Sequence, residues 1–328
     1  MEKLRFGIVG TGTIARRFAE AIGNTKGAVL TAVASRTEEN ARRFADEFGI
    51  PYRFSGYEAM AESDVIDAAY IAVPHSGHIT CSVLMMEHGK HVLCEKPMAV
   101  NAREAKYMFD VAEKNKVLLT EAMWARLVPG TVKMLELVKE GVLGDILAVE
   151  GKFCYTMDEE EMNHHVFKPE CGGGSLLDVG CYGLNYAFWY LGDDIEDVSA
   201  QASYYNGTDS HMCMLLKYRS GAIADVSSAT LLRKPNEGYI YGTKGSAYLK
   251  RFYAPEEIVL DIYGKGTETI SVPYAGNGFE EQIDHFADCV RNGLKESPLV
   301  THARTLQIIG LSDKIREITG IKYPQDIQ

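Results

Sequence analysis

Phe6-Gly7-Ile8-Val9-Gly10-Thr11-Gly12-Thr13-Ile14-Ala15 decides the fold of the first part of this chain. The apolar run before Gly10 predicts a strand, and the residues after Gly12 predict a helix. Gly10 permits the tight turn between the two elements, and Gly12 lets a phosphate group approach the backbone. Ala15 fills the small position where helix and strand pack closely.

The same stretch predicts a phosphate-binding site. Thr13 and Ile14 open the helix, where backbone N–H groups and the helix dipole favour an anion. A glycine-rich turn that binds nothing is the alternative. Because a strand precedes the turn and a helix follows it, we expect the motif to bind the pyrophosphate of NAD or NADP through Gly10, Gly12, Thr13 and Ile14.

The first 120 residues alternate short apolar runs with helical patterns. Strands that alternate with crossover helices form a parallel sheet with both faces covered, so this half is expected to be a doubly wound Rossmann domain. The expected strands cover residues 4–9, 29–34, 52–54, 68–73, 91–94 and 117–120, and the expected helices cover residues 14–22, 38–48, 79–88 and 102–115.

The end of the second expected strand bears on the choice of dinucleotide. NAD-specific proteins usually place an acidic residue there to bind the ribose 2′-hydroxyl. This chain has Ser35 and Arg36 there, and the first carboxylate after the strand is Glu38. A hydroxyl and a guanidinium suit a 2′-phosphate, which favours NADP, with NAD as the open alternative if Arg36 only stacks on the adenine.

Cys94-Glu95-Lys96-Pro97 ends another expected strand. Residues at the carboxyl ends of parallel strands lie where open α/β sheets bind ligands. An ammonium there can polarise a carbonyl, or hold an alcohol oxygen as its proton leaves during hydride transfer. We therefore expect Lys96 to be catalytic and to lie beside the cofactor with Glu95, the alternative being an ordinary surface lysine.

The pattern changes after Trp124. Short turns join many alternating runs, which predicts a large, mostly antiparallel sheet with one open face, in an α+β domain. The expected domains are 1–121, for dinucleotide binding, and 122–328, for substrate binding and dimerisation. We expect helices over residues 175–191, 279–292 and 302–319 to cover one face of this sheet, and a further helix over 130–140.

The run Gly172-Gly173-Gly174-Ser175-Leu176-Leu177-Asp178-Val179-Gly180-Cys181-Tyr182 carries the second set of candidate catalytic residues. Asp178 and Tyr182 are four residues apart, so a helix presents both on one face. A phenol near a cationic lysine can take or give a proton, and the carboxylate can orient a substrate hydroxyl or Lys96. A core tyrosine and a capping carboxylate are the alternatives.

Two further groups are candidate cofactor contacts. Val73, Pro74, His75 and His78 follow an expected strand at the same edge of the sheet as Lys96. The two histidines lack further metal ligands nearby, so we expect hydrogen bonds rather than a zinc site. Trp124 and Arg126 lie at the expected domain junction, where Phe153, Tyr155 and Phe167 are weaker candidates because aromatic residues are more often core.

Composition limits the class of protein. The chain has 328 residues with 46% hydrophobic content and a net charge of −11, which argues against nucleic-acid or anionic-membrane partners. Seven scattered cysteines without a C-x-x-C pair indicate reduced thiols. With no signal-peptide pattern and no long apolar run, a cytoplasmic location is expected.

The motifs together resemble the glucose–fructose oxidoreductase/inositol dehydrogenase (Gfo/Idh/MocA) family along the whole chain. The resemblance is strongest to its dimeric dihydrodiol dehydrogenase and NADP-dependent D-xylose dehydrogenase branch. It rests on the glycine turn, on E-K-P at 95–97, on residues 121–126 and on the histidine pair 75 and 78. It implies that Lys96 is the family lysine and Asp178 its helix aspartate. Most members have histidine where this chain has Tyr182, so the resemblance makes the tyrosine the preferred proton carrier.

The expected function is therefore an NAD(P)-dependent oxidoreductase that transfers hydride between the nicotinamide and a secondary alcohol or carbonyl of a sugar, polyol or cyclic diol. A homodimer or higher homo-oligomer is expected, with no metal. One rival is a regulator that senses dinucleotide and sugar without turnover. The other is a structural or protein-interaction module, which leaves the phosphate-binding turn unexplained.

Overall fold

The computed structural model describes residues 2–327, with the backbone alone at residue 159, and the chain forms two compact units. The first unit contains the chain up to Trp124 together with Ala275–Leu306, and the second contains Ala125–Tyr274 with the residues from Gln307 onward. The expected division of the chain at residue 121 stays a prediction.

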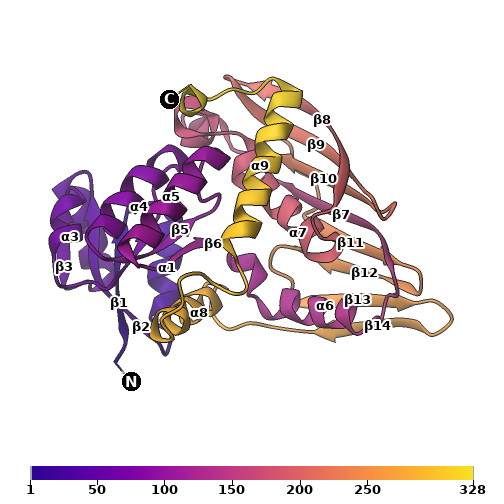
Figure 1. The fold of residues 1–328 in the computed structure, drawn as a ribbon, viewed down its shortest axis with the longest axis horizontal. Helices are drawn as coiled ribbons and strands as arrows, with labels where there is room; N and C mark the ends of the chain where they lie inside the picture. Colours follow the sequence, from indigo (N-terminus) through magenta and orange to yellow (C-terminus); the bar gives the residue numbers. More distant parts are fainter. Residues whose placement is uncertain (1, 328) are drawn as a thin grey trace. The chain divides into compact units, whose positions relative to one another are not determined.

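The first unit is built on a six-stranded parallel sheet in the order β3-β2-β1-β4-β5-β6, as Figure 1 shows. This confirms the Rossmann topology expected from the alternating pattern. The order reverses between β1 and β4, which is the switch point where such sheets bind ligands. The strands are β1 (Leu4–Val9), β2 (Ala28–Ser35), β3 (Tyr52–Ser55), β4 (Ala68–Ile71), β5 (His91–Glu95) and β6 (Leu119–Ala122).

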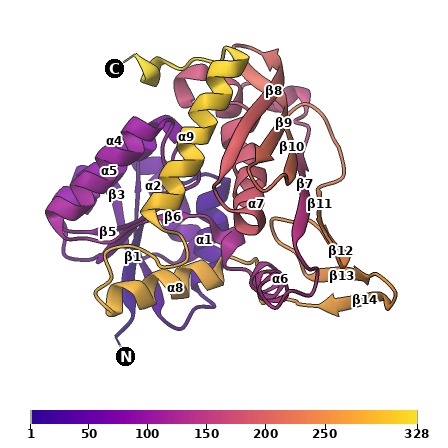
Figure 2. The same ribbon diagram turned by 45° about the vertical axis from the view of Figure 1, so that its right-hand side comes forward.

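Helices cover both faces of the parallel sheet. Because crossovers between parallel strands are right-handed, α1 and α2 cover one face and α4 and α5 cover the other, where Figure 2 shows the latter pair side by side. The helices are α1 (Thr13–Ile22), α2 (Glu38–Phe48), α3 (Glu58–Glu62), α4 (His78–Glu87) and α5 (Ala102–Asn115), with the short η1 (His75–Gly77). Thr37 and Asn101 cap α2 and α5 by accepting hydrogen bonds from backbone N–H groups.

The helix α8 (Glu280–Arg291) also belongs to the first unit. Its buried Phe286 ring lies 5.5 Å from that of Phe6 in β1, and Asp284 accepts a hydrogen bond from the backbone of Gly27 at 2.8 Å. The expectation that residues 279–292 cover the large antiparallel sheet is therefore wrong. The apolar face of α8 was evident from the sequence, but its burial partner is the α1 side of the parallel sheet.

The second unit contains an eight-stranded sheet in the order β14-β13-β12-β11-β7-β10-β9-β8. Among the described strands of this second sheet, only the β7–β10 pairing is parallel, which confirms the expected mostly antiparallel sheet. The strands are β7 (Ile146–Cys154), β8 (Ile195–Tyr205), β9 (Thr208–Tyr218), β10 (Ile223–Ala229), β11 (Glu237–Gly242), β12 (Gly245–Lys250), β13 (Glu257–Ile262) and β14 (Gly266–Ser271).

One face of this sheet is packed and the other is open. In β9 the side chains of Met212, Met214 and Leu216 are buried, whereas the alternating Cys213 and Leu215 are exposed. α7 packs on β7 and β10, and α6 contacts β13, as Figure 1 shows. The remaining helices are α6 (Pro129–Lys139), α7 (Cys181–Leu191) and α9 (His302–Thr319), with short turns η2 (Trp124–Arg126), η3 (Glu159–Glu161), η4 (His165–Phe167), η5 (Pro169–Cys171) and η7 (Pro324–Asp326).

The helix expected over residues 175–191 begins differently. Leu176–Gly180 forms a π-helical turn (η6) that leads directly into α7. Such a turn holds an extra residue and often occurs at functional sites. It contains Asp178.

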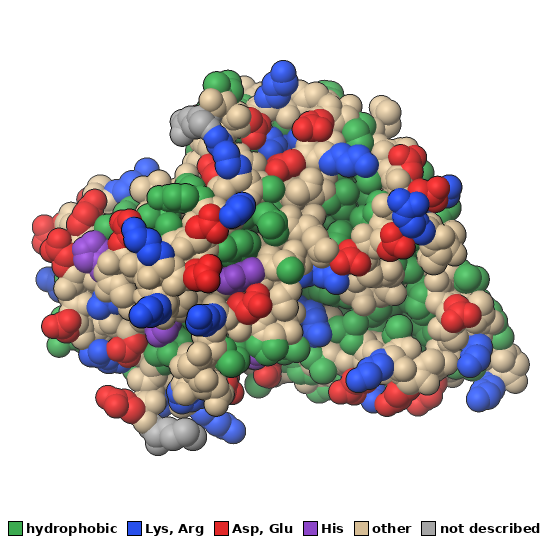
Figure 3. All heavy atoms as spheres, viewed as in Figure 1, with side chains coloured by type: hydrophobic (Ala, Val, Ile, Leu, Met, Phe, Trp, Pro, Cys, Tyr) green, Lys and Arg blue, Asp and Glu red, His purple; other side chains and the backbone are tan. Residues whose placement is uncertain are grey.

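The surface carries both signs of charge. Figure 3 shows acidic and basic side chains interspersed over the face in view. Among the described residues, no helix combines the length and apolar character needed to cross a lipid bilayer.

Candidate functional site

The glycine turn after β1 has the geometry of a phosphate-binding site. Gly10 has φ +108°, and a Cβ there would lie 2.3 Å from the carbonyl oxygen of Ala72, so only glycine fits. A Cβ on Gly12 would meet no protein atom within 4 Å. Because Gly12 is the N-cap of α1, the space in front of it adjoins the N–H groups of Thr13 and Ile14. The residues present therefore fit a dinucleotide phosphate.

Ser35 and Arg36 lie where β2 ends, at the same edge of the sheet as the glycine turn. Ser35 is buried and its carbonyl accepts a hydrogen bond from the N–H of Gly56. Arg36 is exposed, and its charge acts on the nearby phenol of Tyr57. The guanidinium is thus available at the position that a 2′-substituent of the adenosine ribose reaches in this fold.

Lys96 follows β5 at the carboxyl edge of the sheet, two strands from β1. Glu95, which is 4% exposed, accepts the N–H of Lys96 at 3.1 Å and the hydroxyl of Tyr70. Burial raises the pKa of Glu95, and the charges of Lys96 and Arg17 oppose that rise. The lysine ammonium therefore lies in the field of a buried carboxylate.

Glu121 at the end of β6 is a second buried carboxylate near the lysine. It accepts the N–H of Met98 and the hydroxyl of Thr305, each at 3.1 Å. Burial raises its pKa, the charge of Glu95 adds to the rise, and Lys96 opposes it. Glu121 thus fixes the backbone just after the lysine from the neighbouring strand, a role that the sequence analysis did not assign.

His78 is completely buried, and both of its ring nitrogens face backbone carbonyl oxygens. Nδ1 lies 3.0 Å from the oxygen of Pro97 and Nε2 lies 2.9 Å from that of Val73. Burial lowers the pKa of His78 to about 4. The imidazole connects the loops after β4 and β5, while His75 packs edge-on against it at 5.6 Å, next to Pro74.

Trp124 and Arg126 lie in different surroundings. Trp124 is 2% exposed, and its ring packs 5.1 Å from that of Phe279, with the Arg17 guanidinium also over it. This places Trp124 in the first unit close to the charged group of α1. Arg126 belongs to the second unit, where burial lowers its pKa and its charge acts on Tyr190 of α7.

In the second unit, Asp178 is held by a phenol. The Tyr155 hydroxyl donates to Asp178 Oδ2 at 2.5 Å. Burial raises the pKa of Tyr155 well above its ordinary value, and the Asp178 charge adds to this. Tyr155 therefore remains a hydrogen-bond donor at neutral pH and fixes the orientation of the carboxylate.

Tyr182 lies in an aromatic cluster with Phe153 and Tyr253. Its ring centroid is 5.4 Å from that of Phe153 and 5.7 Å from that of Tyr253, and the latter two rings stack at 4.0 Å. Tyr182 is 6% exposed. Phe153 of this cluster and Tyr155, the partner of Asp178, both lie at the end of β7. Phe167, in contrast, is buried against Tyr205 and belongs to the core.

A buried carboxylate anchors the helix that carries Asp178 and Tyr182. Asp209 of β9 accepts the N–H of Leu176 at 2.6 Å and the hydroxyl of Ser175 at 2.7 Å. Gly174, with φ +110°, leaves room for it, because a Cβ there would lie 2.1 Å from Asp209 Oδ1. The hydroxyl of Tyr323 also donates to the carbonyl of Gly173. The glycine run is therefore needed for the close approach of β9 and the C-terminal segment.

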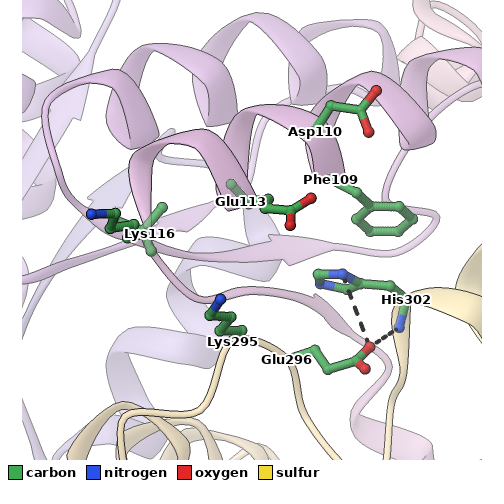
Figure 4. Close-up of a pocket in the computed structure, with 9 residues that line it drawn as sticks. Phe109, Asp110, Glu113, Lys116, Lys295, Glu296 and His302 are labelled. Atoms are coloured by element: carbon green, nitrogen blue, oxygen red, sulfur yellow. Dashed lines mark hydrogen bonds and ion pairs between the residues drawn. The ribbon is translucent and has the colours of Figure 1, made fainter.

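A hollow in the first unit lies beside the start of β6, at the opposite edge of the sheet from Lys96 (Figure 4). His302 stacks on Phe109 at 4.1 Å and its Nε2 lies 2.8 Å from the carbonyl oxygen of Leu119. Glu296 accepts the N–H of His302, as the dashed lines in Figure 4 show. These contacts hold the start of α9 against the sheet and are remote from the glycine turn.

The sequence signals that located these residues were all local. Gly10, Gly12, Ser35, Arg36, Glu95, Lys96 and the residues from Val73 to His78 come from the carboxyl ends of strands of one sheet. The sequence did not identify three residues of these sites, namely Glu121, Asp209 and Tyr253. For Glu121 the signal was available, since it ends an apolar strand at the same edge as Lys96.

Comparison with known proteins gives consistent matches. Residues 4–123 match the family model described as "Oxidoreductase family, NAD-binding Rossmann fold" (GFO_IDH_MocA), and residues 131–248 match the GFO/IDH/MocA C-terminal domain. The trans-1,2-dihydrobenzene-1,2-diol dehydrogenase of Mus musculus is 32% identical over 336 residues, covering 98% of this chain and 99% of that protein. The enzyme of that name from Xenopus laevis is 31% identical with the same coverage.

Among solved structures, a 3-ketoreductase from Actinomadura kijaniata in complex with NADP and TDP-benzene superposes with a TM-score of 0.89 at 27% identity. The match covers 97% of this chain and 98% of that one. Two further structures of the same ketoreductase are of variants that replace a tyrosine or a lysine.

Proposed function

We propose that this chain, a member of the Gfo/Idh/MocA family of NAD(P)-binding oxidoreductases, is an NADP-preferring dehydrogenase or reductase of a sugar, polyol or cyclic diol. The substrate carries a secondary alcohol or the corresponding carbonyl, as in a sugar, a polyol or a cyclic diol. The observation that carries the proposal is the position of Lys96, at the same sheet edge as the glycine turn and beside two buried carboxylates.

The cofactor residues follow from the geometry of the first unit. Gly10, Gly12 and the start of α1 would hold the pyrophosphate, and Ser35 with Arg36 would bind a 2′-phosphate. The spacing of β1 and β5 is two strand separations, roughly 10 Å, which suits a dinucleotide extended along this edge. When bound, the nicotinamide supplies hydride transfer.

Lys96 and Tyr182 would donate a proton to the reacting oxygen or accept one from it, and Asp178 would position the substrate. The Lys96 ammonium can stabilise the reacting oxygen as its proton leaves or arrives. Tyr155 supports Asp178 in this role by its 2.5 Å hydrogen bond, because an oriented carboxylate can accept a substrate hydroxyl in one geometry.

The test is the Lys96→Met variant with a panel of sugars and diols, assayed by nicotinamide absorbance with each cofactor. General acid–base catalysis contributes about 10²–10⁴-fold, so kcat should fall by that factor while dinucleotide affinity is retained. Wild-type turnover in the variant on a confirmed substrate would contradict the assignment. Binding without turnover of any panel member by the wild type would favour a regulatory protein.

The open face of the antiparallel sheet supports a homodimer. Leu215 and Ile223 expose 51% and 48% of their surface there, on neighbouring strands. Two such faces would bury these apolar side chains against each other. Light scattering should give a dimer mass for the wild type and a smaller mass for Leu215→Glu; a wild-type monomer would refute it. The seven free thiols support a reducing compartment such as the cytoplasm.

A further inference from the structure

The turn after β12 places a guanidinium beside the aromatic cluster of Tyr182. Arg251 follows Lys250, the last residue of β12, and its Cζ lies 5.7 Å from the ring centroid of Tyr253. The Tyr253 ring in turn stacks on Phe153 and contacts Tyr182. Tyr253 thus contacts both the Arg251 guanidinium and the ring of the proposed proton carrier.

The backbone at Arg251 is held in an uncommon conformation. Its φ is +52°, in the left-handed region that side chains other than glycine and asparagine seldom adopt. Its N–H donates to the carbonyl of Asn236 at 2.7 Å, and its carbonyl accepts from Ala254 at 2.6 Å. Such strain persists where the surrounding structure fixes it, and it concentrates at ligand-binding sites.

The turn is also anchored on both sides. Phe252 is 1% exposed and packs 4.8 Å from Tyr186 of α7, so Arg251 and Tyr253 flank a residue fixed in the core. Asn236 Oδ1 accepts the N–H of Cys154 at 2.8 Å, which connects the turn to the end of β7. The exposed guanidinium is therefore presented from a rigid base beside the Phe153–Tyr253 stack.

This arrangement suits a particular substrate. The faces of aromatic rings pack against the apolar face of a sugar or carbocycle. A guanidinium binds a carboxylate or phosphate through paired, charge-assisted hydrogen bonds. Burial opposes the rise, but the pKa of Arg251 is raised by its hydrogen bond to the Tyr253 side chain and by the charges of Tyr253, Tyr274 and, least, Glu256.

We infer that Arg251 is a substrate-binding residue for an anionic group, and that the substrate is a cyclic polyol bearing a carboxylate or a phosphate. The ring lies against Phe153 and Tyr253, and the anion binds Arg251. This inference rests on the proposed function, since it uses the same site, and it narrows the substrate class.

The experiment compares three ring substrates that differ in charge: D-glucose, D-glucuronate and D-glucose 6-phosphate. Binding to the NADP-loaded protein is measured by calorimetry at low and high ionic strength, and kcat/KM is measured alongside. Removing a charge-assisted hydrogen bond costs about 1.5–3 kcal/mol, which corresponds to roughly 10- to 100-fold in affinity. Arg251→Gln should lower the ratio of anion to glucose affinity by that factor, and Arg251→Lys should restore part of it.

Arg219→Gln is the matched control, because Arg219 is an exposed arginine of the same unit whose partner is Asp194. It should leave the affinity ratio unchanged. Preference for glucuronate alone identifies a carboxylate substrate, and preference for the phosphate identifies a sugar phosphate; either result supports the inference. Arg251→Asn, which tolerates the left-handed backbone, repeats the test if Arg251→Gln is unstable.

Equal affinity of wild type and Arg251→Gln for both anions would overturn the inference even if the enzyme oxidises neutral sugars, which would leave the proposed function intact. Conversely, Arg251-dependent binding of an anion without turnover of any substrate would support the subsite and contradict the proposed enzymatic function. The binding measurement thus distinguishes a failure of the Arg251 inference from a failure of the proposed enzymatic function.

Discussion

The Tyr155 hydroxyl donates a 2.5 Å hydrogen bond to the carboxylate of Asp178, from the end of β7 to the π-helical turn before α7. The π turn places Asp178 where a residue just beyond a strand can reach it. A phenol whose pKa is raised by burial keeps its proton, so the contact survives over the physiological pH range. Tyr155 therefore fixes the orientation of the Asp178 carboxylate within the protein itself.

Replacing Tyr155 by phenylalanine removes this donor and little volume. A hydrogen bond to a charged group contributes about 1.5–3 kcal/mol, so we expect kcat/KM to fall roughly 10- to 100-fold with dinucleotide affinity retained. Tyr263→Phe, at an exposed tyrosine between β13 and β14, is the control and should leave kcat/KM unchanged. Steady-state kinetics check this, and an unchanged kcat/KM for Tyr155→Phe would refute it.

Alanine substitutions at Gly10 and Gly12 should affect different properties of the protein. A Cβ at Gly10 meets the Ala72 carbonyl and its φ is left-handed, so Gly10→Ala should cost about 1–3 kcal/mol of folding stability. Gly12 has φ −79° and open space before it, so Gly12→Ala should shift Tm by less than about 2 °C. It should nevertheless weaken dinucleotide binding at least tenfold, as fluorescence titration would detect. Normal dinucleotide affinity in Gly12→Ala would place the phosphates elsewhere.

The proposed preference for NADP over NAD can be tested at Arg36. Removing a guanidinium that binds a 2′-phosphate should raise the Kd for NADPH about 10- to 100-fold and leave the Kd for NADH nearly unchanged. Arg43→Ala, at an exposed arginine of α2, is the control. Equal weakening of both cofactors by Arg36→Ala would indicate stacking on the adenine instead.

Asp209 gives the stability a pH dependence of known sign. Burial raises its pKa to about 6, above the value near 3.9 in an unfolded chain. The folded state thus binds this proton more tightly, and the resulting stabilisation is full below pH 4 and lost as pH rises through 6. Relative to Asp209→Asn, the wild type should lose on the order of 3 kcal/mol between pH 4 and 7.

Urea unfolding at several pH values measures this difference. Asp194→Asn, at an exposed carboxylate of the same unit, is the control. A constant difference between wild type and Asp209→Asn across this range would mean that the Asp209 carboxylate is ionised throughout.

Local sequence signals found most of the first unit and part of the second. Lys96 could be placed because a strand ending, a proline and an apolar run are neighbours in sequence, and parallel strands bring their carboxyl ends to one edge. Tyr253 could not be placed, since its partner Phe153 lies a hundred residues earlier and the contact depends on the order β12-β11-β7. The same holds for α8, whose apolar face is visible in the sequence while the surface that buries it is not.

Tyr323 is 1% exposed, and its hydroxyl donates to the carbonyl of Gly173 in the glycine run in front of α7. The segment around Tyr323 therefore fixes a loop that lies 150 residues earlier in the chain. Cleavage just before Tyr323 should therefore impair the proposed site in front of α7 before it unfolds the protein.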